Sequence, residues 1–469
     1  MNIQPLYGFL LIIWLSIAGR SIVKSENHIE VGYRVMMEVP EEYRYGFVGR
    51  AYLMEAKQAA EPKFRAALSV EGVEGNRYAC SLEVFLGDVR VWSSGHLSRF
   101  YTAEKCVVEL TEKGDLRLKG PQERLGWRTA TSGQGVQRLR LLKNGNLVLV
   151  DSLNRIKWQS FNYPTDVLLW GQSVEVATRL TSFPTNSTSF YSLEIQNDKV
   201  ALYLNSGNMQ YSYWDFKPSS TRNITFVEVG TRGLEFFDDK NRKFALIPSQ
   251  RLEPVRFLAL GNRTGNLELF FYSTEKEKFE ASFQALKTTC DLPMACKPYG
   301  ICTFSDACLC LQIAARQGRM VSNCSEGIPS GFCERGEAEM LELEGVSSVL
   351  RGVSSSVNIS KEACTALCID NCNCTAALYS SGEGTNRELQ ECFLYGFVGG
   401  VKQVRTGIGL SYLVKVPKGT GGDHGKSSGL KKWVLIMVAV ADVFIIFMAL
   451  GGLGLYLIRK RRKDLPDRS

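Results

Sequence analysis

Cysteine is the residue whose number and spacing in this chain point most directly to chemistry. There are 14 cysteines, and six of them, from Cys290 to Cys324, follow the pattern C-x5-C-x5-C-x5-C-x-C-x13-C. Clustered cysteines bind zinc inside cells, whereas in an oxidising compartment they form disulfides. An even number of cysteines, in a chain that also carries export signals, favours disulfides over metal ligands.

The sequence gives little support to a catalytic function. None of the three histidines, His28, His96 and His424, adjoins a nucleophile motif such as G-x-S-x-G. The acidic pair Asp238-Asp239 flanks an expected strand, and we interpret it as a solvated turn. We therefore expect no enzyme activity, no cofactor and no resident metal.

A repeat of short strands is expected to form the first domain. Residues 108–118 (VELTEKGDLRL) and 139–149 (LRLLKNGNLVL) align without gaps, and each copy has a Gly before a polar Asp115 or Asn146. Apolar residues at every second position predict strands, and Asn144-Gly145 predicts a tight hairpin. A weaker third copy lies at residues 86–91.

A tryptophan follows each copy of the repeat, namely Trp92, Trp127 and Trp158. Three hairpin-like units of similar sequence are expected to bury a shared core. We predict a pseudo-threefold β domain whose indole rings meet near its axis. Core packing is the simpler role for these rings, and stacking on a ligand is the alternative.

Residues 144–172, NGNLVLVDSLNRIKWQSFNYPTDVLLWGQ, resemble the plant bulb-type (G-type) lectin domain of S-domain receptor-like proteins. The resemblance covers about residues 45–180. It implies a mostly β fold, with a bulb-type lectin β-prism that contains a single disulfide between Cys80 and Cys106.

The mannose site of bulb-type lectins uses a Gln-x-Asp-x-Asn-x-Val-x-Tyr strand, and this chain departs from it. The five places in the third repeat hold Leu142, Asn144, Asn146, Val148 and Val150. A buried sugar hydroxyl without its partner loses about 1–3 kcal/mol. We therefore expect weak mannose binding, with Asn144, Asn146 and Val148 as the best remaining contacts.

The rest of the ectodomain resembles the modules that follow the lectin in this family. The expected order is a lectin-like domain (19–185), an S-locus glycoprotein-like β domain (186–286), an EGF-like module (287–326) and an α+β PAN/apple domain (333–416). In the family's PAN domain a helix with a C-x3-C motif lies against a sheet. The pairings that the resemblance implies are Cys290–Cys302, Cys296–Cys308, Cys310–Cys324, Cys333–Cys372, Cys364–Cys392 and Cys368–Cys374.

Two apolar segments predict export and membrane attachment. Residues 1–18 resemble a signal peptide. Residues 433–458 are long enough for a transmembrane helix, and they contain a single charge, Asp442. The basic residues of the tail, 459–469, are expected in the cytoplasm. A Gly/Ser-rich stalk (417–430) precedes the span. Six N-glycosylation sequons lie between the two apolar segments: Asn186, Asn223, Asn262, Asn323, Asn358 and Asn373.

These features predict a single-pass plasma-membrane glycoprotein, with its N-terminus outside, that resembles S-domain receptor-like proteins without the kinase. Its formal charge of +8 comes in large part from the basic tail and does not indicate binding to nucleic acid. One candidate function is recognition of carbohydrate or glycoprotein ligands. The alternative is a co-receptor or decoy that binds protein partners through its PAN and S-locus-like surfaces. Asp442 could hold the span to a receptor kinase or to a second copy, or it could simply be tolerated.

Overall fold

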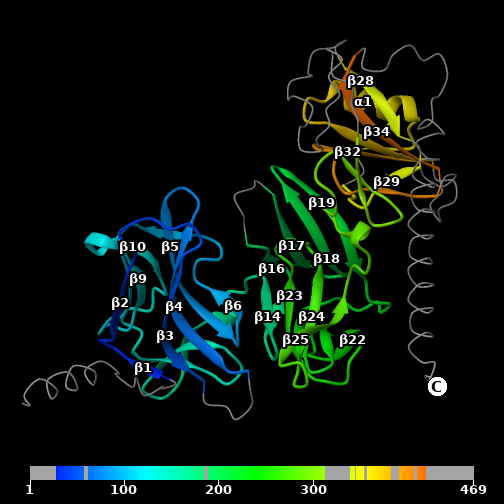
Figure 1. Ribbon diagram of the computed structural model, residues 1–469. Helices are drawn as coiled ribbons and strands as arrows, with labels where there is room; N and C mark the ends of the chain where they lie inside the picture. Colours follow the sequence, from blue (N-terminus) through cyan, green and yellow to red (C-terminus); the bar gives the residue numbers. More distant parts are fainter. Residues whose placement is uncertain are drawn as a thin grey trace, which may run out of the picture. The chain divides into compact units, whose positions relative to one another are not determined.

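The computed structural model describes residues 28–56, 62–183, 189–311, 338–343, 345–352, 356–381, 390–405 and 409–418 (Figure 1). The expected signal peptide, the span with Asp442, the basic tail and the part of the stalk after residue 418 lie outside these residues. Among the residues described, no helix is long and apolar enough to cross a membrane. The described chain is mostly β structure with one α-helix, and it divides into unit 1 (residues 1–173) and unit 2 (residues 174–469). The prediction of a mostly β fold is confirmed.

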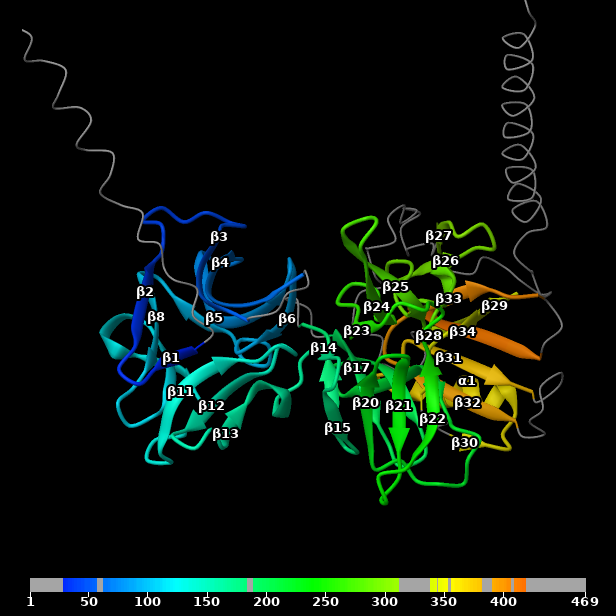
Figure 2. The same ribbon diagram turned by 90° about the horizontal axis from the view of Figure 1, so that it is seen from below.

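Unit 1 contains three antiparallel sheets, two with four strands and one with five. In order across the first sheet, the strands are β1 (His28–Glu30), β11 (Val136–Leu141), β12 (Leu147–Asp151) and β13 (Ile156–Gln159). The second sheet contains β10 (Leu125–Arg128), β9 (Leu116–Lys119), β8 (Lys105–Leu110) and β2 (Arg34–Glu38). The third contains β3 (Val48–Glu55), β4 (Phe64–Val73), β5 (Arg77–Leu86) and β6 (Val89–Ser93). A short strand, β7 (Phe100–Thr102), pairs with β5, and β14 (Val167–Leu169) lies near the end of the unit. Figure 2 shows β11, β12 and β13 side by side.

The three copies of the sequence repeat form hairpins where they are expected. The hairpins are β8–β9, β11–β12 and, for the weaker copy, β5–β6. The turn glycines Gly114 and Gly145 have φ angles of 81° and 86°, in the region that favours glycine. A Cβ on Gly145 would lie 2.4 Å from Cε1 of Phe64, so this turn packs directly on the core of the unit.

The first part of unit 2 contains three further sheets. Their strands include β16 (Arg179–Thr181), β17 (Ser189–Ile195), β18 (Val200–Ser206) and β19 (Met209–Phe216); β15 (Ser173–Glu175), β20 (Phe226–Gly230), β21 (Gly233–Phe237) and β22 (Lys243–Pro248); and β23 (Val255–Leu260), β24 (Leu267–Ser273) and β25 (Lys278–Gln284). The expected hairpin around residues 196–198 joins β17 to β18. As the sequence predicts, no α-helix occurs among the described residues of this part.

The same hairpin turn occurs in both units. In unit 1 the carboxylate of Asp151 accepts hydrogen bonds from the backbone N–H of Leu153 and of Arg155, at 2.9 Å each, and from Arg155 Nε at 2.7 Å. In unit 2 the carboxylate of Asp238 accepts from the corresponding groups of Lys240 and Arg242 at 2.9–3.0 Å. The interpretation of Asp238-Asp239 as a solvated turn is wrong for Asp238, whose carboxylate is buried to close this turn.

We expect acid to destabilise both units through these two carboxylates. Burial opposes their ionisation, but the hydrogen bonds from the turn outweigh it and lower the pKa of Asp151 and of Asp238 to about 2. Because the folded pKa lies below the usual value, the contribution is complete above about pH 4 and is lost as the pH falls toward 2. Acid titration followed by circular dichroism should show Asp151→Asn with a weaker pH dependence than wild type. The exposed Asp88→Asn should leave the titration unchanged, and equal curves for wild type and Asp151→Asn would contradict this account.

The cysteine-rich remainder of unit 2 forms two sheets and one helix. The first sheet contains β27 (Cys308–Cys310), β26 (Gly300–Cys302), β33 (Val401–Gln403) and β29 (Val346–Ser348). The second contains β28 (Ala338–Leu343), β34 (Leu410–Pro417), β31 (Ala376–Ser380), β32 (Glu391–Tyr395) and β30 (Ser356–Val357). Strand β26 of the expected EGF-like module pairs in parallel with β33 of the expected PAN domain. The two segments therefore share a sheet and are joined by backbone hydrogen bonds.

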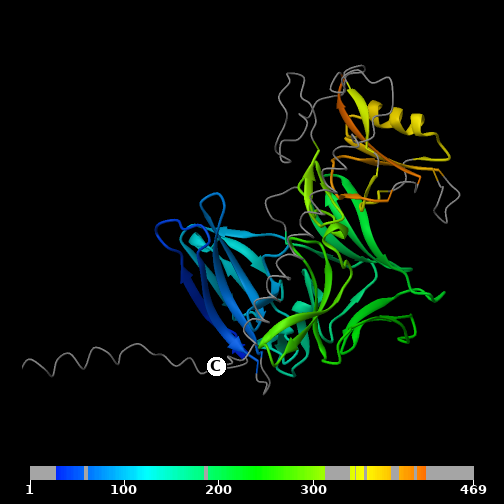
Figure 3. The ribbon, with the colours of Figure 1, turned by 45° about the vertical axis from the view of Figure 1, so that its right-hand side comes forward.

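Helix α1 (Lys361–Asp370) lies along the second sheet (Figure 3). The hydroxyl of Ser360 caps its N-terminus by accepting a hydrogen bond from the N–H of Ala363, at 3.2 Å. Cys364 and Cys368, four residues apart, lie on the buried face of the helix. This is the C-x3-C helix that the family resemblance leads us to expect in this segment.

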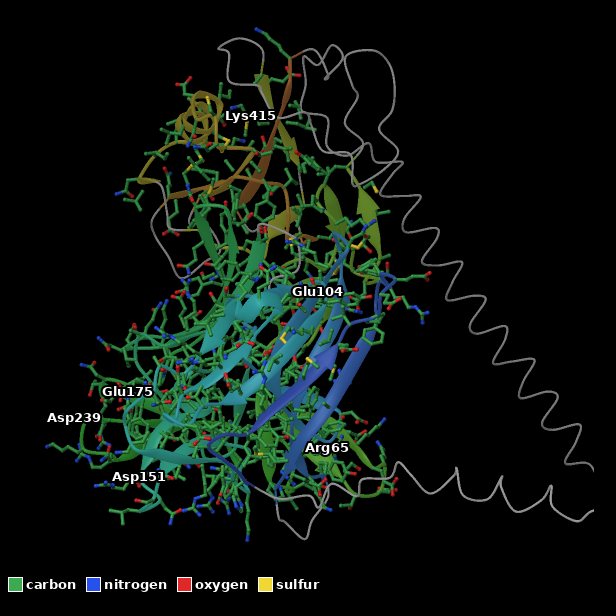
Figure 4. All side chains as sticks on the ribbon, turned by 90° about the vertical axis from the view of Figure 1, so that its left-hand side faces the viewer. Arg65, Glu104, Asp151, Glu175, Asp239 and Lys415 are labelled. Carbon is green, nitrogen blue, oxygen red and sulfur yellow. A yellow bond between two sulfur atoms is a disulfide. The ribbon has the colours of Figure 1, made fainter. Side chains whose placement is uncertain are left out.

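The last turn of α1 is held by a buried lysine of β34. Lys415 Nζ donates to the carbonyl oxygens of Cys368, Ile369 and Asn371 at 3.3, 2.9 and 3.2 Å, and Figure 4 shows Lys415 beside the helix. Carbonyl groups at a helix C-terminus have no partners within the helix, and they carry partial negative charge. Burial lowers the pKa of the Lys415 ammonium, which the carboxylate of Asp370 partly opposes.

Replacement of Lys415 by methionine should weaken this helix. The substitution keeps an apolar chain of similar length but removes the charged donor, and hydrogen bonds from a charged group are worth about 1.5–3 kcal/mol. We expect Lys415→Met to lower the free energy of unfolding by about 2 kcal/mol, measured by urea denaturation. Lys361 is the matched control, since its ammonium pairs with Glu342 at the surface. Lys361→Met should change stability by less than about 1 kcal/mol. Equal effects of the two substitutions would contradict the role given to Lys415.

Candidate functional site

The structure places the predicted sugar contacts of the third repeat mostly inside the protein. Val148 is buried in β12, and Asn146 is buried directly before the same strand. Asn146 Nδ2 donates to Gln159 Oε1 at 2.8 Å, and Asn146 Oδ1 accepts from Ser160 Oγ at 3.2 Å and from the N–H of Phe161 at 3.3 Å. Asn144 is partly exposed, and its Oδ1 accepts from the N–H of Asn146. Asn144 is therefore the member of the set that an incoming sugar reaches most easily.

The position of Asn146 has the same structural role in other hairpins. Asp115 occupies it in the second repeat, where its carboxylate accepts from the N–H of Thr131, from Thr129 Oγ1 and from Arg117 Nε. Burial opposes ionisation of Asp115, but these hydrogen bonds outweigh it and lower its pKa. In unit 2, Asn266 donates to the carbonyl oxygen of Leu286 and accepts from its N–H, both at 2.9 Å. In each case the polar side chain ties a hairpin to the segment that follows the next strand.

The tryptophans meet as the repeat predicts. Trp92, Trp127 and Trp158 lie on β6, β10 and β13, which are edge strands of the three sheets of unit 1. Their ring centroids lie 5.8–6.2 Å apart, with interplanar angles of 68–78°. Such edge-to-face contacts are favourable for aromatic rings. The prediction that the three indoles meet is confirmed.

A hollow of about 200 Å³ opens over this cluster of three indoles, and we call it the indole pocket. Tyr163 forms part of its wall, with its ring stacked on Trp158 at 5.8 Å and 53% of the residue exposed. The chain around Tyr163 is fixed, since its carbonyl oxygen accepts a hydrogen bond from Trp92 Nε1 at 3.0 Å. The pocket thus presents one accessible aromatic face above a rigid indole floor.

Polar groups also line the indole pocket. Ser94, Arg128, Thr129 and Thr165 lie around it, so donors and acceptors stand beside the aromatic rings. Among the residues that the structure describes, the buried hydroxyl of Thr165 has no hydrogen-bond partner. An aromatic surface with a few polar groups beside it is the usual construction of a small-molecule site. For the indoles, the sequence favours core packing over ligand stacking, and it does not mark the exposed Tyr163, two residues after the WQSF segment.

The structure contains five of the predicted disulfides: Cys80–Cys106, Cys290–Cys302, Cys296–Cys308, Cys364–Cys392 and Cys368–Cys374. Cys310 and Cys372 are also disulfide-bonded, and their predicted partners, Cys324 and Cys333, lie outside the described residues. Asp306 lies near Cys290 and Cys302, but the sulfurs of this pair are bonded to each other and cannot serve as thiolate ligands.

Four of the predicted glycosylation sites are exposed: Asn223, Asn262, Asn358 and Asn373. Asn186 and Asn323 lie outside the described residues. Of the three histidines, His424 also lies outside, His28 begins β1, and His96 is buried at the indole pocket with its Nδ1 3.9 Å from Asp166 Oδ1.

Residues 91–188 match the family described as D-mannose binding lectin. A G-type lectin S-receptor-like serine/threonine-protein kinase of Arabidopsis thaliana is 26% identical over 398 residues, which cover 80% of this chain and 46% of the relative. A PAN domain-containing protein of the same plant is 26% identical over 374 residues, 76% of this chain and 73% of the relative. The chain is a relative of the plant S-domain receptor-like proteins.

An EP1-like glycoprotein of Arabidopsis thaliana is 26% identical over 320 residues, which cover 62% of this chain and 70% of that protein. The chain thus spans about half the length of the receptor-like kinase that it matches. Among solved structures, a mannose-binding lectin of Gastrodia elata is 17% identical, with a TM-score of 0.19, and covers 29% of this chain and 95% of its own. Because that score is low, the relationship rests on the sequence matches.

Proposed function

We propose that this S-domain protein is a cell-surface receptor-like glycoprotein that recognises carbohydrate through the β-prism of unit 1, without catalysis. The observation that carries the proposal is the position of the indole pocket. All of its lining residues, from Trp92 to Thr165, fall within residues 91–188, which match the D-mannose binding lectins. Sugars present an apolar C–H face and a ring of hydroxyl groups, and the pocket offers Tyr163 and polar side chains to match them.

The position of Tyr163 supports a role in binding. Its exposed ring can pack on the apolar face of a sugar, while the guanidinium group of Arg128, which lines the same pocket, can donate hydrogen bonds to the sugar hydroxyls. Shallow sites of this kind bind single sugars weakly, since each hydrogen bond that forms replaces one to water. Asn144, Asn146 and Val148 remain a second candidate sugar site in the same unit, and a sugar would contact Asn144 first.

Substitution of Tyr163 tests this proposal. The secreted ectodomain should bind a subset of neutral glycans on an array, and Tyr163→Ala should weaken that binding at least tenfold by removing the stacking surface. Tyr45→Ala is the matched control, because Tyr45 is 71% exposed in the same unit and does not line the pocket. Full binding by Tyr163→Ala would show that the sugar site lies outside the indole pocket. Asn144→Ala would then be the next variant to examine.

The second candidate function is a co-receptor or decoy that binds protein partners. The internal hydrogen bonds of Asn146 favour it, because they occupy a side chain that the mannose motif would use. The cysteine-rich segment also exposes a large apolar side chain, Phe304, with 70% of the residue accessible. In this function the predicted span at residues 433–458, with Asp442, would attach the protein to the plasma membrane beside a receptor kinase or a second copy.

A further inference from the structure

Three arginines surround a second hollow in unit 1, separate in its lining residues from the indole pocket. The hollow has a volume of about 520 Å³, and we call it the arginine pocket. Arg77 comes from the start of β5, Arg99 from the residue before β7, and Arg124 from the residue before β10. The fold therefore gathers three cationic side chains that are up to 47 positions apart in the chain.

Aromatic rings hold two of these guanidinium groups in place. Arg77 Cζ lies 4.2 Å from the ring centroid of Tyr101, and Arg124 Cζ lies 5.2 Å from that of Phe100. Arg124 Nη2 also donates a hydrogen bond to the carbonyl oxygen of Tyr101. The Phe100 ring packs so closely on β10 that a Cβ on Gly126 would lie 2.1 Å from its Cγ. A guanidinium group stacked on a fixed ring keeps its orientation and leaves its N–H donors at its edge.

The arginine pocket has no carboxylate among its lining residues. Within the described part of the chain, neither Arg77 nor Arg124 forms an ion pair. Other arginines of the protein do so, as Arg117 does with Asp115 and Arg155 with Asp151. Two acidic residues adjoin the lining in sequence: Glu104, which is exposed, and Glu123, which is already paired with Arg34 and Lys119. Arg77 and Arg124 therefore bring positive charge to the pocket that no ion pair in the described residues neutralises.

We infer that the arginine pocket binds a short acidic saccharide, one whose sugar rings bear carboxylate groups. A planar guanidinium group matches a carboxylate with two parallel hydrogen bonds, which fixes the orientation of the bound group. The volume falls in the range of about 300–1,000 Å³ that is usual for small-molecule sites. The preference for an anion stands on the arginines alone, whereas the assignment of that anion to a saccharide rests on the proposed carbohydrate recognition.

Titration of the secreted ectodomain with trigalacturonate, followed by calorimetry, tests this inference. We expect binding that weakens as salt is raised, and an affinity at least tenfold lower in the double variant Arg77→Gln/Arg124→Gln. The control is Arg138→Gln/Arg140→Gln on β11, which removes the same charge away from the pocket. The single variant Arg77→Gln, at an exposed position, provides the same test if the double variant folds poorly, as judged by its thermal midpoint.

Several results would overturn the inference. They are equal binding to the double variant and to wild type, equal loss in the β11 control, and binding of neutral galactotriose with the same affinity as trigalacturonate. Hexaglutamate that binds as tightly as trigalacturonate would show an anion surface that does not recognise sugars. Tyr163→Ala separates the two proposals, since it should weaken neutral glycans and leave trigalacturonate unchanged. Loss of trigalacturonate binding in that variant would place the acidic ligand in the indole pocket instead.

Discussion

Replacement of Trp158 by alanine should destabilise unit 1 more than any other single substitution considered for it, by about 3–5 kcal/mol. The indole is 7% exposed and contacts both other indoles and the ring of Tyr163. Its removal leaves a cavity at the point where the edge strands of three sheets meet. Those strands belong to three different sheets, so the indoles join the sheets through side-chain contacts.

Urea denaturation followed by circular dichroism measures this effect without depending on tryptophan fluorescence. Trp170→Ala is the matched control, because it removes the same side chain from the same unit at a position where 48% of the residue is exposed. Surface substitutions usually change stability by about 0.5 kcal/mol or less, and a partly exposed indole somewhat more. Similar losses in the two variants would show that the three-indole cluster is not the core of the unit.

Loss of the Cys364–Cys392 disulfide should have the next largest effect. This bridge joins α1 to β32 across 28 positions, and both cysteines are fully buried. Removal of a native disulfide from a small secreted domain typically costs about 2–5 kcal/mol. The double substitution Cys364→Ala/Cys392→Ala should therefore loosen α1 from its sheet, even though Cys368–Cys374 still holds its last turn.

Hydrogen exchange of peptides that cover residues 361–370 reports on this helix directly. The double cysteine variant should exchange these amides much faster than wild type, because local opening becomes easier. Leu367→Ala on the same helix is the control, since Leu367 is 41% exposed and takes no part in the bridges. Unchanged protection in the double variant would show that the helix is held mainly by packing and by Lys415.

The alternation of apolar residues predicted much of the fold, because strand side chains point to opposite faces with a period of two. It located the hairpins of unit 1 and several strands of unit 2. The sequence repeat nevertheless extends further than the three copies in unit 1. Residues 265–267, Gly-Asn-Leu, match 145–147 in sequence, and Asn266 and Asn146 have the same role. The matching turns at Asp151 and Asp238 carry the same signal, a D-x-x-N-R pattern that a comparison of the two units would have found.

The candidate sites were harder to predict, because each depends on residues that are distant in sequence. Nothing in the local sequence shows that the side chain of Asn146 is hydrogen-bonded to Ser160 and Phe161, which follow the next strand. The arginine pocket gathers residues from three separate strands, and no motif marks them. The burial of Lys415 under the end of α1 also needs the pairing of β34 with β31, which only the tertiary fold defines.

Carbohydrate binding by unit 1 in the indole pocket is the proposal on which the function of the protein rests. The most direct measurement is the ¹H–¹⁵N spectrum of the indole groups of the ectodomain, titrated with the glycan that binds best on the array. The claim predicts that the signals of Trp92, Trp127 and Trp158 shift together with one binding constant, while that of Trp170 stays in place. Saturable binding of that glycan with no shift of these three signals would contradict it.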